Sequence, residues 1–183
     1  KATMEGHAQI IYIDDKGTYK NGEEALLSAG IYLLGSGSEV TMTDNSSMEN
    51  LSKTGSIQHP SFPATEGVSG IAVGEGGTIT MDKEAQMLDF INGYGMWVGK
   101  DATATMATNA KIKNKGITLR NAYGVYLLSS KLFMKDSAEI NSRIYGINSS
   151  GANVRIVMQD SSLISNCSNY GIYSPGASTQ IEM

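Results

Sequence analysis

The chain has 183 residues, which suits one ordinary domain; 40% of them are hydrophobic and 17% are charged. This composition excludes a disordered chain, and 21 glycines with three prolines exclude a collagen or a Pro-rich linker. The net charge of −4 argues against a nucleic-acid-binding protein, and a single cysteine excludes an internal disulfide. No apolar run approaches the roughly 18 residues of a membrane span, so we expect no membrane insertion of this chain.

A repeat marked by methionine organises the sequence. Seven of the ten methionines recur along the chain, and the last four intervals between them are 25, 28, 24 and 25 residues. These residues are Met4, Met42, Met81, Met106, Met134, Met158 and Met183. Because methionine fills irregular gaps in cores well, we interpret this column as buried packing rather than as a metal site.

The first predicted strand of each unit ends at the methionine. The residue two positions before it is apolar in every unit, and the residue between them is usually threonine. The apolar residues are Ala2, Val40, Ile79, Ala104, Leu132, Ile156 and Ile181. This alternation predicts a short strand with one buried face and a β-branched outer face.

A second predicted strand lies four to six residues after the methionine, where a small residue is followed by a large one. The large residues are Ile10, Met48, Met87, Ile112, Ile140 and Ile164. The connection after this strand varies in length from unit to unit, and two long insertions enter there, at 14–29 and 52–69. Loops at one corner of adjacent coils are neighbours, so these insertions, with His59 and Phe62 in the second, are candidate binding elements. The alternative is that they only cover the flank of the solenoid.

A third predicted strand begins at a recurring glycine, 10 to 12 residues before the next methionine. The glycines are Gly30, Gly70, Gly95, Gly124, Gly146 and Gly171. By alternation, the outer side of this strand carries Tyr32, Trp97, Tyr126 and Tyr173, which we expect to be partly exposed and able to bind sugars or proteins. The tyrosines before the glycines share the parity of the buried positions, so we expect them to stack in the core or at a corner; they are Tyr94, Tyr123, Tyr145 and Tyr170.

Three short strands per unit, with like residues at like positions, predict an all-β right-handed parallel β-helix of about seven coils. Each coil of such a solenoid hydrogen-bonds to the next, about 4.8 Å away, so matching side chains lie above one another. A β-sandwich explains the pattern less well, because sandwiches do not repeat one residue at one place six times. We expect residues 1–183 to form a single β-helix domain.

The recurring pattern of Tyr-Gly, then Gly-Ile/Val-Tyr, then Thr-Met resembles the passenger domain of bacterial autotransporters (type V secretion), whose fold is the pertactin-like β-helix. This residue pattern is most similar to that of Bartonella-type passengers. The resemblance implies a piece of a longer exported precursor, with an outer-membrane translocator barrel that is absent here. It also implies a location outside the bacterium, secreted or on the cell surface.

Basic residues gather in one stretch of an otherwise acidic chain. Between Lys100 and Lys135, seven lysines and arginines face one acidic residue, Asp101. The outward positions of neighbouring coils predict a basic belt that attracts a sulfated glycan or an acidic receptor surface. Its candidate residues are Lys111, Lys113, Lys115, Arg120 and Lys131. The alternative is a solvated face that discourages aggregation.

The sequence favours a non-catalytic binding role, as an adhesin or receptor agonist directed at a host-cell surface protein or matrix component. We assign no catalytic residue, no metal ligand and no cofactor. The rival hypothesis is a polysaccharide lyase or glycoside hydrolase, classes that the same fold hosts. Asp44, Asp136 and Asp160 share a column, which Lys83 and Thr108 interrupt. We expect these aspartates to hydrogen-bond to their own backbone at a turn.

Overall fold

A computed structural model describes residues 1–6, 9–14, 29–33, 36–52, 56–59, 62–66, 68–88, 93–114, 123–142 and 144–183. The side chains of residues 9–14, 29, 32, 50–52, 56–59, 62–66 and 68–69 lie outside this description. The described residues form strands and turns without a helix, and the strands form parallel sheets that wind into a β-solenoid. The predicted fold class is therefore confirmed.

Three parallel sheets make the three sides of the solenoid. Sheet A contains β1 (Ala2–Met4), β4 (Glu39–Met42), β9 (Thr78–Met81), β12 (Thr103–Met106), β15 (Lys131–Met134), β18 (Arg155–Met158) and β21 (Gln180–Glu182). Sheet B contains β2 (Gln9–Asp14), β5 (Ser47–Ser52), β10 (Gln86–Leu88), β13 (Lys111–Lys113), β16 (Glu139–Asn141) and β19 (Leu163–Ser165). Sheet C contains β3 (Ala29–Leu33), β8 (Val68–Val73), β11 (Gly93–Val98), β14 (Tyr123–Leu128), β17 (Tyr145–Ser150) and β20 (Tyr170–Tyr173).

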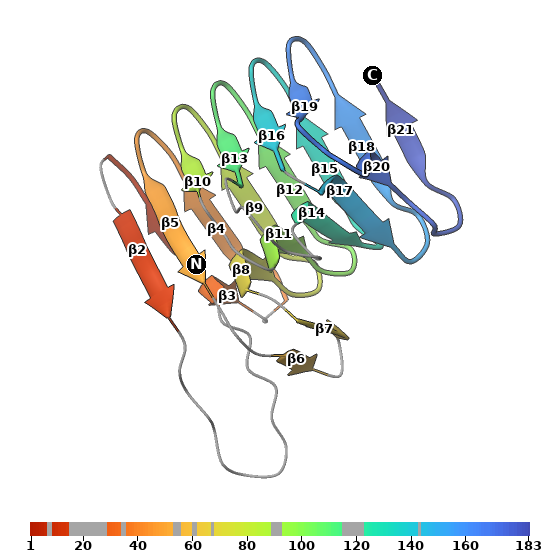
Figure 1. Ribbon diagram of the computed structural model, residues 1–183, viewed down its shortest axis with the longest axis horizontal. Helices are drawn as coiled ribbons and strands as arrows, with labels where there is room; N and C mark the ends of the chain where they lie inside the picture. The colour runs from red at the N-terminus through yellow and green to blue at the C-terminus, as the bar shows by residue number, and fades with distance from the viewer. Residues whose placement is uncertain are drawn as a thin grey trace.

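Each turn of the solenoid visits sheets A, B and C in that order. The strands of the described residues make six complete coils and part of a seventh, slightly different from the prediction of about seven. Figure 1 shows the coils stacked from the red N-terminal end to the blue C-terminal end. Parallel strands need a crossover between them, and here the two other sides of the coil provide it.

The register of the sheets confirms the predicted columns. In sheet A, Met42 pairs with Met4 and Met81, and the methionine column continues through Met106, Met134 and Met158. In sheet B, Met87 pairs with Met48 and Ile112. Side chains of the same kind therefore lie above one another along the stack, as the repeat predicts.

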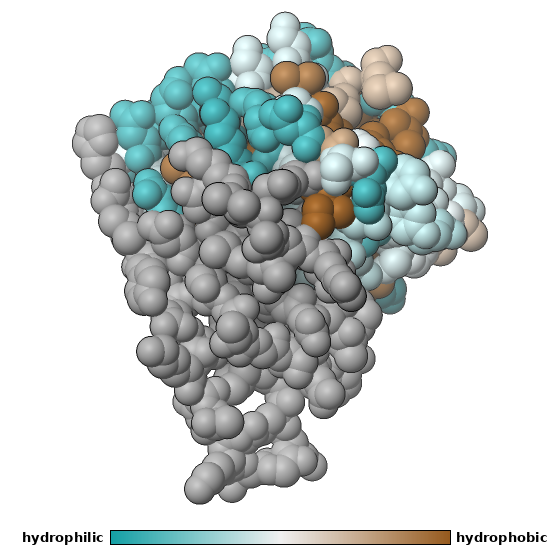
Figure 2. Space-filling view, viewed as in Figure 1, coloured by the Kyte–Doolittle hydropathy of each residue, from teal (hydrophilic) through white to brown (hydrophobic). Residues whose placement is uncertain are grey.

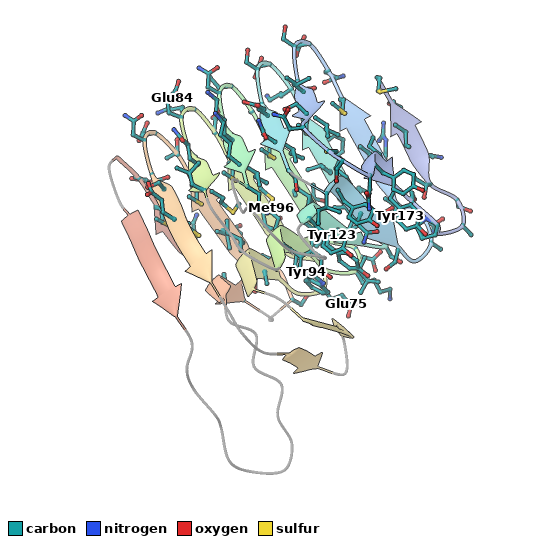
Figure 3. The ribbon with its side chains drawn as sticks, viewed as in Figure 1. Glu75, Glu84, Tyr94, Met96, Tyr123 and Tyr173 are labelled. Carbon is teal, nitrogen blue, oxygen red and sulfur yellow. The ribbon has the colours of Figure 1, made fainter. Side chains whose placement is uncertain are left out.

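These columns fill one continuous hydrophobic core. Met42, Met81 and Met106 of sheet A, Met87 of sheet B and Met96 of sheet C are all fully buried. Figure 3 shows Met96 inside the stack. Burying each such side chain contributes about 1.5–3 kcal/mol, so the methionine column from Met4 to Met134 is a structural core, as predicted. Met158 is partly buried, and Met183 is exposed, contrary to the prediction.

The corner between sheets A and B requires a left-handed backbone in every described coil. The residue two positions after the methionine has a φ of 54 to 63° in six successive coils. These residues are Gly6, Asp44, Lys83, Thr108, Asp136 and Asp160. Glycine and aspartate adopt this conformation readily, whereas it strains lysine and threonine.

The corner between sheets B and C receives the two insertions. The first joins β2 to β3 and the second joins β5 to β8. The second was predicted as a loop, but it contains an antiparallel hairpin of β6 (Ser56–His59) and β7 (Phe62–Glu66), which lies outside the stack in Figure 1. A hairpin satisfies the backbone hydrogen bonds of a long connection within the connection itself.

Candidate ligand-binding surface

The outer face of sheet C carries a ladder of aromatic rings. Tyr94 stacks on Tyr123 with ring centroids 5.0 Å apart, and Tyr123 stacks on Tyr145 at 4.9 Å. Tyr145 in turn lies 5.9 Å from Tyr170 and 6.0 Å from Tyr173. Figure 3 shows Tyr94, Tyr123 and Tyr173 along the stack of coils. We call Tyr94, Trp97, Tyr123, Tyr126, Tyr145, Tyr170 and Tyr173 the aromatic ladder.

The tyrosines before the glycines stack on one another, as predicted, but Tyr94 packs outside the main core. Tyr94 belongs to a separate cluster with Trp97 and Tyr126, while Met96 belongs to the main core. A residue and its second neighbour on the strand thus face opposite sides. The alternation breaks at the glycine between them, so both aromatic columns lie on the outer face.

Close packing inside the solenoid explains why a glycine stands at the break. A Cβ atom on Gly124 would lie 2.3 Å from Cγ2 of Ile140 and 2.6 Å from the backbone oxygen of Gly146. One on Gly146 would lie 2.3 Å from Cγ2 of Ile164. Only glycine fits where sheet C approaches sheet B so closely. The residue before it can then point outward.

Exposure increases along the ladder toward the C-terminal end. Trp97 and Tyr126, predicted to be partly exposed, are 3% and 5% exposed because they pack with Tyr94 and Ala72 in one outer cluster. Tyr173 is 40% exposed, as predicted, and Tyr170 is 52% exposed. The side chain of Tyr32 lies outside the described residues. The accessible part of the ladder is therefore its C-terminal end.

Hydrogen bonds hold the rings in place. The Tyr126 hydroxyl lies 2.6 Å from Oγ of Ser150, and Asn169 donates a hydrogen bond to the Tyr145 hydroxyl at 3.3 Å. Burial raises the pKa of Tyr123, and the neighbouring tyrosines add to this effect. The rings are therefore held in fixed positions, with the faces of neighbouring rings stacked on one another and their edges toward the outside of sheet C.

Sequence reasoning did not select Tyr145 and Tyr170 as binding candidates, although both lie in this surface. Alternation by two assigned them to the buried side. The glycine that follows each tyrosine was the available signal, because a glycine within a strand often marks a bend or a close backbone approach.

The second insertion places His59 and Phe62 opposite each other. These residues are paired across the turn between β6 and β7. Their side chains lie outside the described residues, so the binding role predicted for them stays a prediction. The hairpin lies in the connection from β5 of sheet B to β8 of sheet C, the sheet that carries the aromatic ladder.

The structure places the described residues of the predicted basic belt on two different sides of the solenoid. Lys111 and Lys113 flank the fully buried Ile112 on β13 and point outward, as predicted. Lys131 begins β15 in sheet A, on another side of the solenoid. Lys115 and Arg120 lie outside the described residues. Lys131 therefore does not share the face that carries Lys111 and Lys113.

Carboxylates interleave with the lysines of sheet B. Lys111 pairs in register with Gln86 and Glu139, and Nζ of Lys113 lies 3.9 Å from Oε2 of Glu139. Figure 2 shows hydrophilic residues, in teal, over the upper part of this view. This arrangement favours the alternative interpretation, a solvated face of mixed charge, for the sheet B lysines.

The aspartates at the corner of sheets A and B accept hydrogen bonds from the backbone of the preceding coil, whereas the sequence predicts bonds to their own backbone. Oδ2 of Asp136 accepts a hydrogen bond from the N–H of Thr108 at 3.1 Å, and Oδ2 of Asp160 accepts one from the N–H of Asp136 at 3.1 Å. Asp44 accepts one from Gly6 in the same way. Coil stacking brings a backbone N–H of the preceding coil within reach of each of these carboxylates. The column therefore links successive coils through an aspartate ladder.

The pKa of Asp82 at the same corner is lowered from the ordinary value of an aspartate. The hydrogen bond from the Thr108 hydroxyl, at 2.7 Å, is the largest cause and outweighs partial burial; the backbone N–H of Lys83 also donates to Asp82 at 2.7 Å. A general acid for glycoside cleavage would need the opposite shift. These contacts indicate a structural carboxylate.

We expect Asp82→Asn to destabilise the fold by about 0.2–1 kcal/mol at pH 7. The pKa of Asp82 is lower in the folded state, so its stabilisation is present above the unfolded value and is lost as the pH falls through the folded value. Urea unfolding should therefore show a difference between native and variant that shrinks below about pH 4. Thr108→Val should reduce the same pH-dependent difference, whereas a difference independent of pH would contradict the assignment.

Within the described ranges, no group of three or more His, Cys, Asp or Glu side chains is placed to hold a metal ion. The same part of the chain contains no helix of the length and apolarity that crossing a bilayer requires. No protein-family model matches the chain, and no curated protein or solved structure matches it. Its function is therefore inferred from the surface described above.

Proposed function

We propose that this chain is a non-catalytic binding module of an exported bacterial protein, acting as an adhesin or as a released receptor agonist. Its partner is a host-cell surface protein or a matrix component. The aromatic ladder on the outer face of sheet C, which continues through Tyr145, Tyr170 and Tyr173, is the observation that supports this proposal. Large exposed apolar side chains gathered on one surface are typical of interaction sites.

The rigidity of the scaffold supports a binding role. Tyr170 and Tyr173 lie on a strand that pairs with β17, and their rings stack with centroids 5.2 Å apart. Rings held by a sheet lose little conformational entropy when a partner binds, which favours affinity. Tyrosine also offers a hydroxyl beside its apolar ring, a combination enriched at interfaces.

The proposed origin is an autotransporter passenger, displayed on the bacterial surface or released from it. The columns that carry the resemblance, the methionines of sheet A and the Tyr-Gly pairs of sheet C, run through successive coils of the solenoid. A single cysteine also suits a chain that must cross the outer membrane unfolded.

We expect the double variant Tyr170→Ser and Tyr173→Ser to bind host cells or their matrix about tenfold more weakly, or worse. The reason is that interface aromatic residues often contribute over about 1.4 kcal/mol to binding. The measurement is saturation binding of the labelled chain to endothelial cells. Leu163→Ser is the matched control, because Leu163 is an equally exposed apolar residue at the same end but on sheet B.

Equal losses for both variants, or unchanged binding for the tyrosine double variant, would place the interface elsewhere. Turnover of a polysaccharide by the native chain would contradict the non-catalytic role and favour the lyase or hydrolase hypothesis. A screen of uronate-containing and neutral polysaccharides measures that turnover directly.

A further inference from the structure

A surface pocket lies at the corner of sheets C and A near the C-terminal end. Its volume is about 290 Å³, near the lower limit of roughly 300 Å³ for small-molecule sites. It is lined by Lys131, Asn153, Val154, Arg155, Ser178 and Gln180. None of these residues is acidic, and sequence reasoning singled out Lys131 alone among them.

The repeat itself builds this pocket. Lys131, Arg155 and Gln180 are the first residues of β15, β18 and β21, and they pair in register along sheet A. Asn153 and Ser178 lie two positions earlier in their coils, where φ is 59° and 60°. The left-handed turns place a row of polar side chains beside the row of strand starts. An elongated ligand can therefore lie along the corner.

One cation of the pocket is held rigidly and the other is available. Arg155 contacts Glu182 through Nε at 3.0 Å and Nη2 at 3.2 Å, and its guanidinium lies 5.8 Å from the ring centre of Phe133. Lys131 is exposed and forms no ion pair with any residue in the described parts of the chain. With Glu182 included, the local charge remains positive.

The chain leads from the C-terminal end of the aromatic ladder to the pocket within a few residues. Tyr173 is the last residue of β20, and the segment that follows it leads through Ser178 to Gln180 at the start of β21. The hydroxyls of Ser174 and Thr179, 2.5 Å apart, close this turn. The end of the ladder and the edge of the pocket are therefore joined by one short closed turn.

We propose that this pocket binds the anionic group of an acidic polysaccharide, with the adjoining sugar stacked on Tyr173. The Lys131 ammonium and the Arg155 guanidinium attract the anion, while the amide and hydroxyl groups of Asn153, Ser178 and Gln180 suit sugar oxygens. Sulfate and carboxylate groups share this chemistry. The inference rests on the proposed binding function and names the ligand class of that surface.

The proposal is tested by calorimetric titration of the chain with a heparin hexasaccharide and with a hyaluronan hexasaccharide. Each titration is done at 50 mM and at 200 mM salt. We expect Lys131→Glu to weaken binding at least tenfold, and higher salt to weaken binding by the native chain. Lys135→Glu is the matched control: it makes the same charge change on an exposed residue just after the same strand, away from the pocket. It should change affinity less than twofold.

Binding of heparin alone identifies sulfate as the group, and binding of both glycans identifies either anion; both results support the pocket. Equal losses for Lys131→Glu and Lys135→Glu indicate diffuse attraction and overturn it, as does the absence of binding at 50 mM salt. If cell binding still depends on Tyr170 and Tyr173 while neither glycan binds, the pocket inference fails and the proposed function stands. If a glycan binds while cells and matrix do not, the pocket inference stands and the proposed function fails.

Discussion

Gly124→Ala is expected to destabilise the folded chain by about 3 kcal/mol, at the upper end of the usual cost of overpacking a core. The added methyl would lie 2.3 Å from Cγ2 of Ile140 and 2.6 Å from the backbone oxygen of Gly146. Ile140 is fully buried, and the close packing of protein cores limits how far its side chain can move away. The nearby backbone is held by the hydrogen bonds of sheet C. Urea unfolding measures the loss.

Gly171→Ala is the matched control in the same column. At Gly171 the nearest atom to an added Cβ is Cγ2 of Ile164, at an ordinary distance of 3.8 Å. This variant should be neutral, or up to about 1 kcal/mol more stable because alanine restricts the unfolded chain. If Gly124→Ala were as stable as Gly171→Ala, close packing would not be the reason for the glycine column.

Met106→Ala is expected to cost about 2–5 kcal/mol, the usual range for removing a fully buried long side chain. Met106 pairs in register with Met81 and Met134, which are also buried, so the truncation leaves a cavity between two coils. Strands on either side limit how far the core can collapse into it. Thermal and urea unfolding should both report the loss.

Met183→Ala provides the comparison within the same sequence column. Met183 is 94% exposed, so its truncation should change the free energy of unfolding by less than about 0.5 kcal/mol. Similar effects at Met106 and Met183 would mean that position in the repeat, rather than burial, determines the contribution of this residue type.

The repeat was sufficient to predict much of the fold. Met42 above Met81, Met87 above Ile112, and Met96 above Val125 are all observed neighbours that alignment of the units predicts. This works because a solenoid stacks equivalent positions at a constant spacing. Residue identity in one coil then reports directly on contacts with the next. The hairpin of β6 and β7 breaks the repeat, and it was missed for that reason.

The binding surface was predicted less well. Tyr173 is exposed as predicted, but Trp97 and Tyr126 are buried on the outer face. Alternation within a strand assigns one face to each residue and assumes that an outward side chain meets solvent. Here the rings of neighbouring coils cover one another, so exposure depends on position along the stack.

The order of residues alone determined the periodic part of this protein: three strands per unit, their register and the methionine core. These follow from local alternation and from like side chains matching between units. The tertiary structure decided which way Tyr94 points, which lysines share a side, and that Lys131 and Arg155 line a pocket together with Asn153 and Ser178. Those outcomes depend on how closely two sheets approach and how sharply each corner turns. Contacts between sheets determine both the approach of the sheets and the shape of the corners. The sequence of one strand does not contain that information.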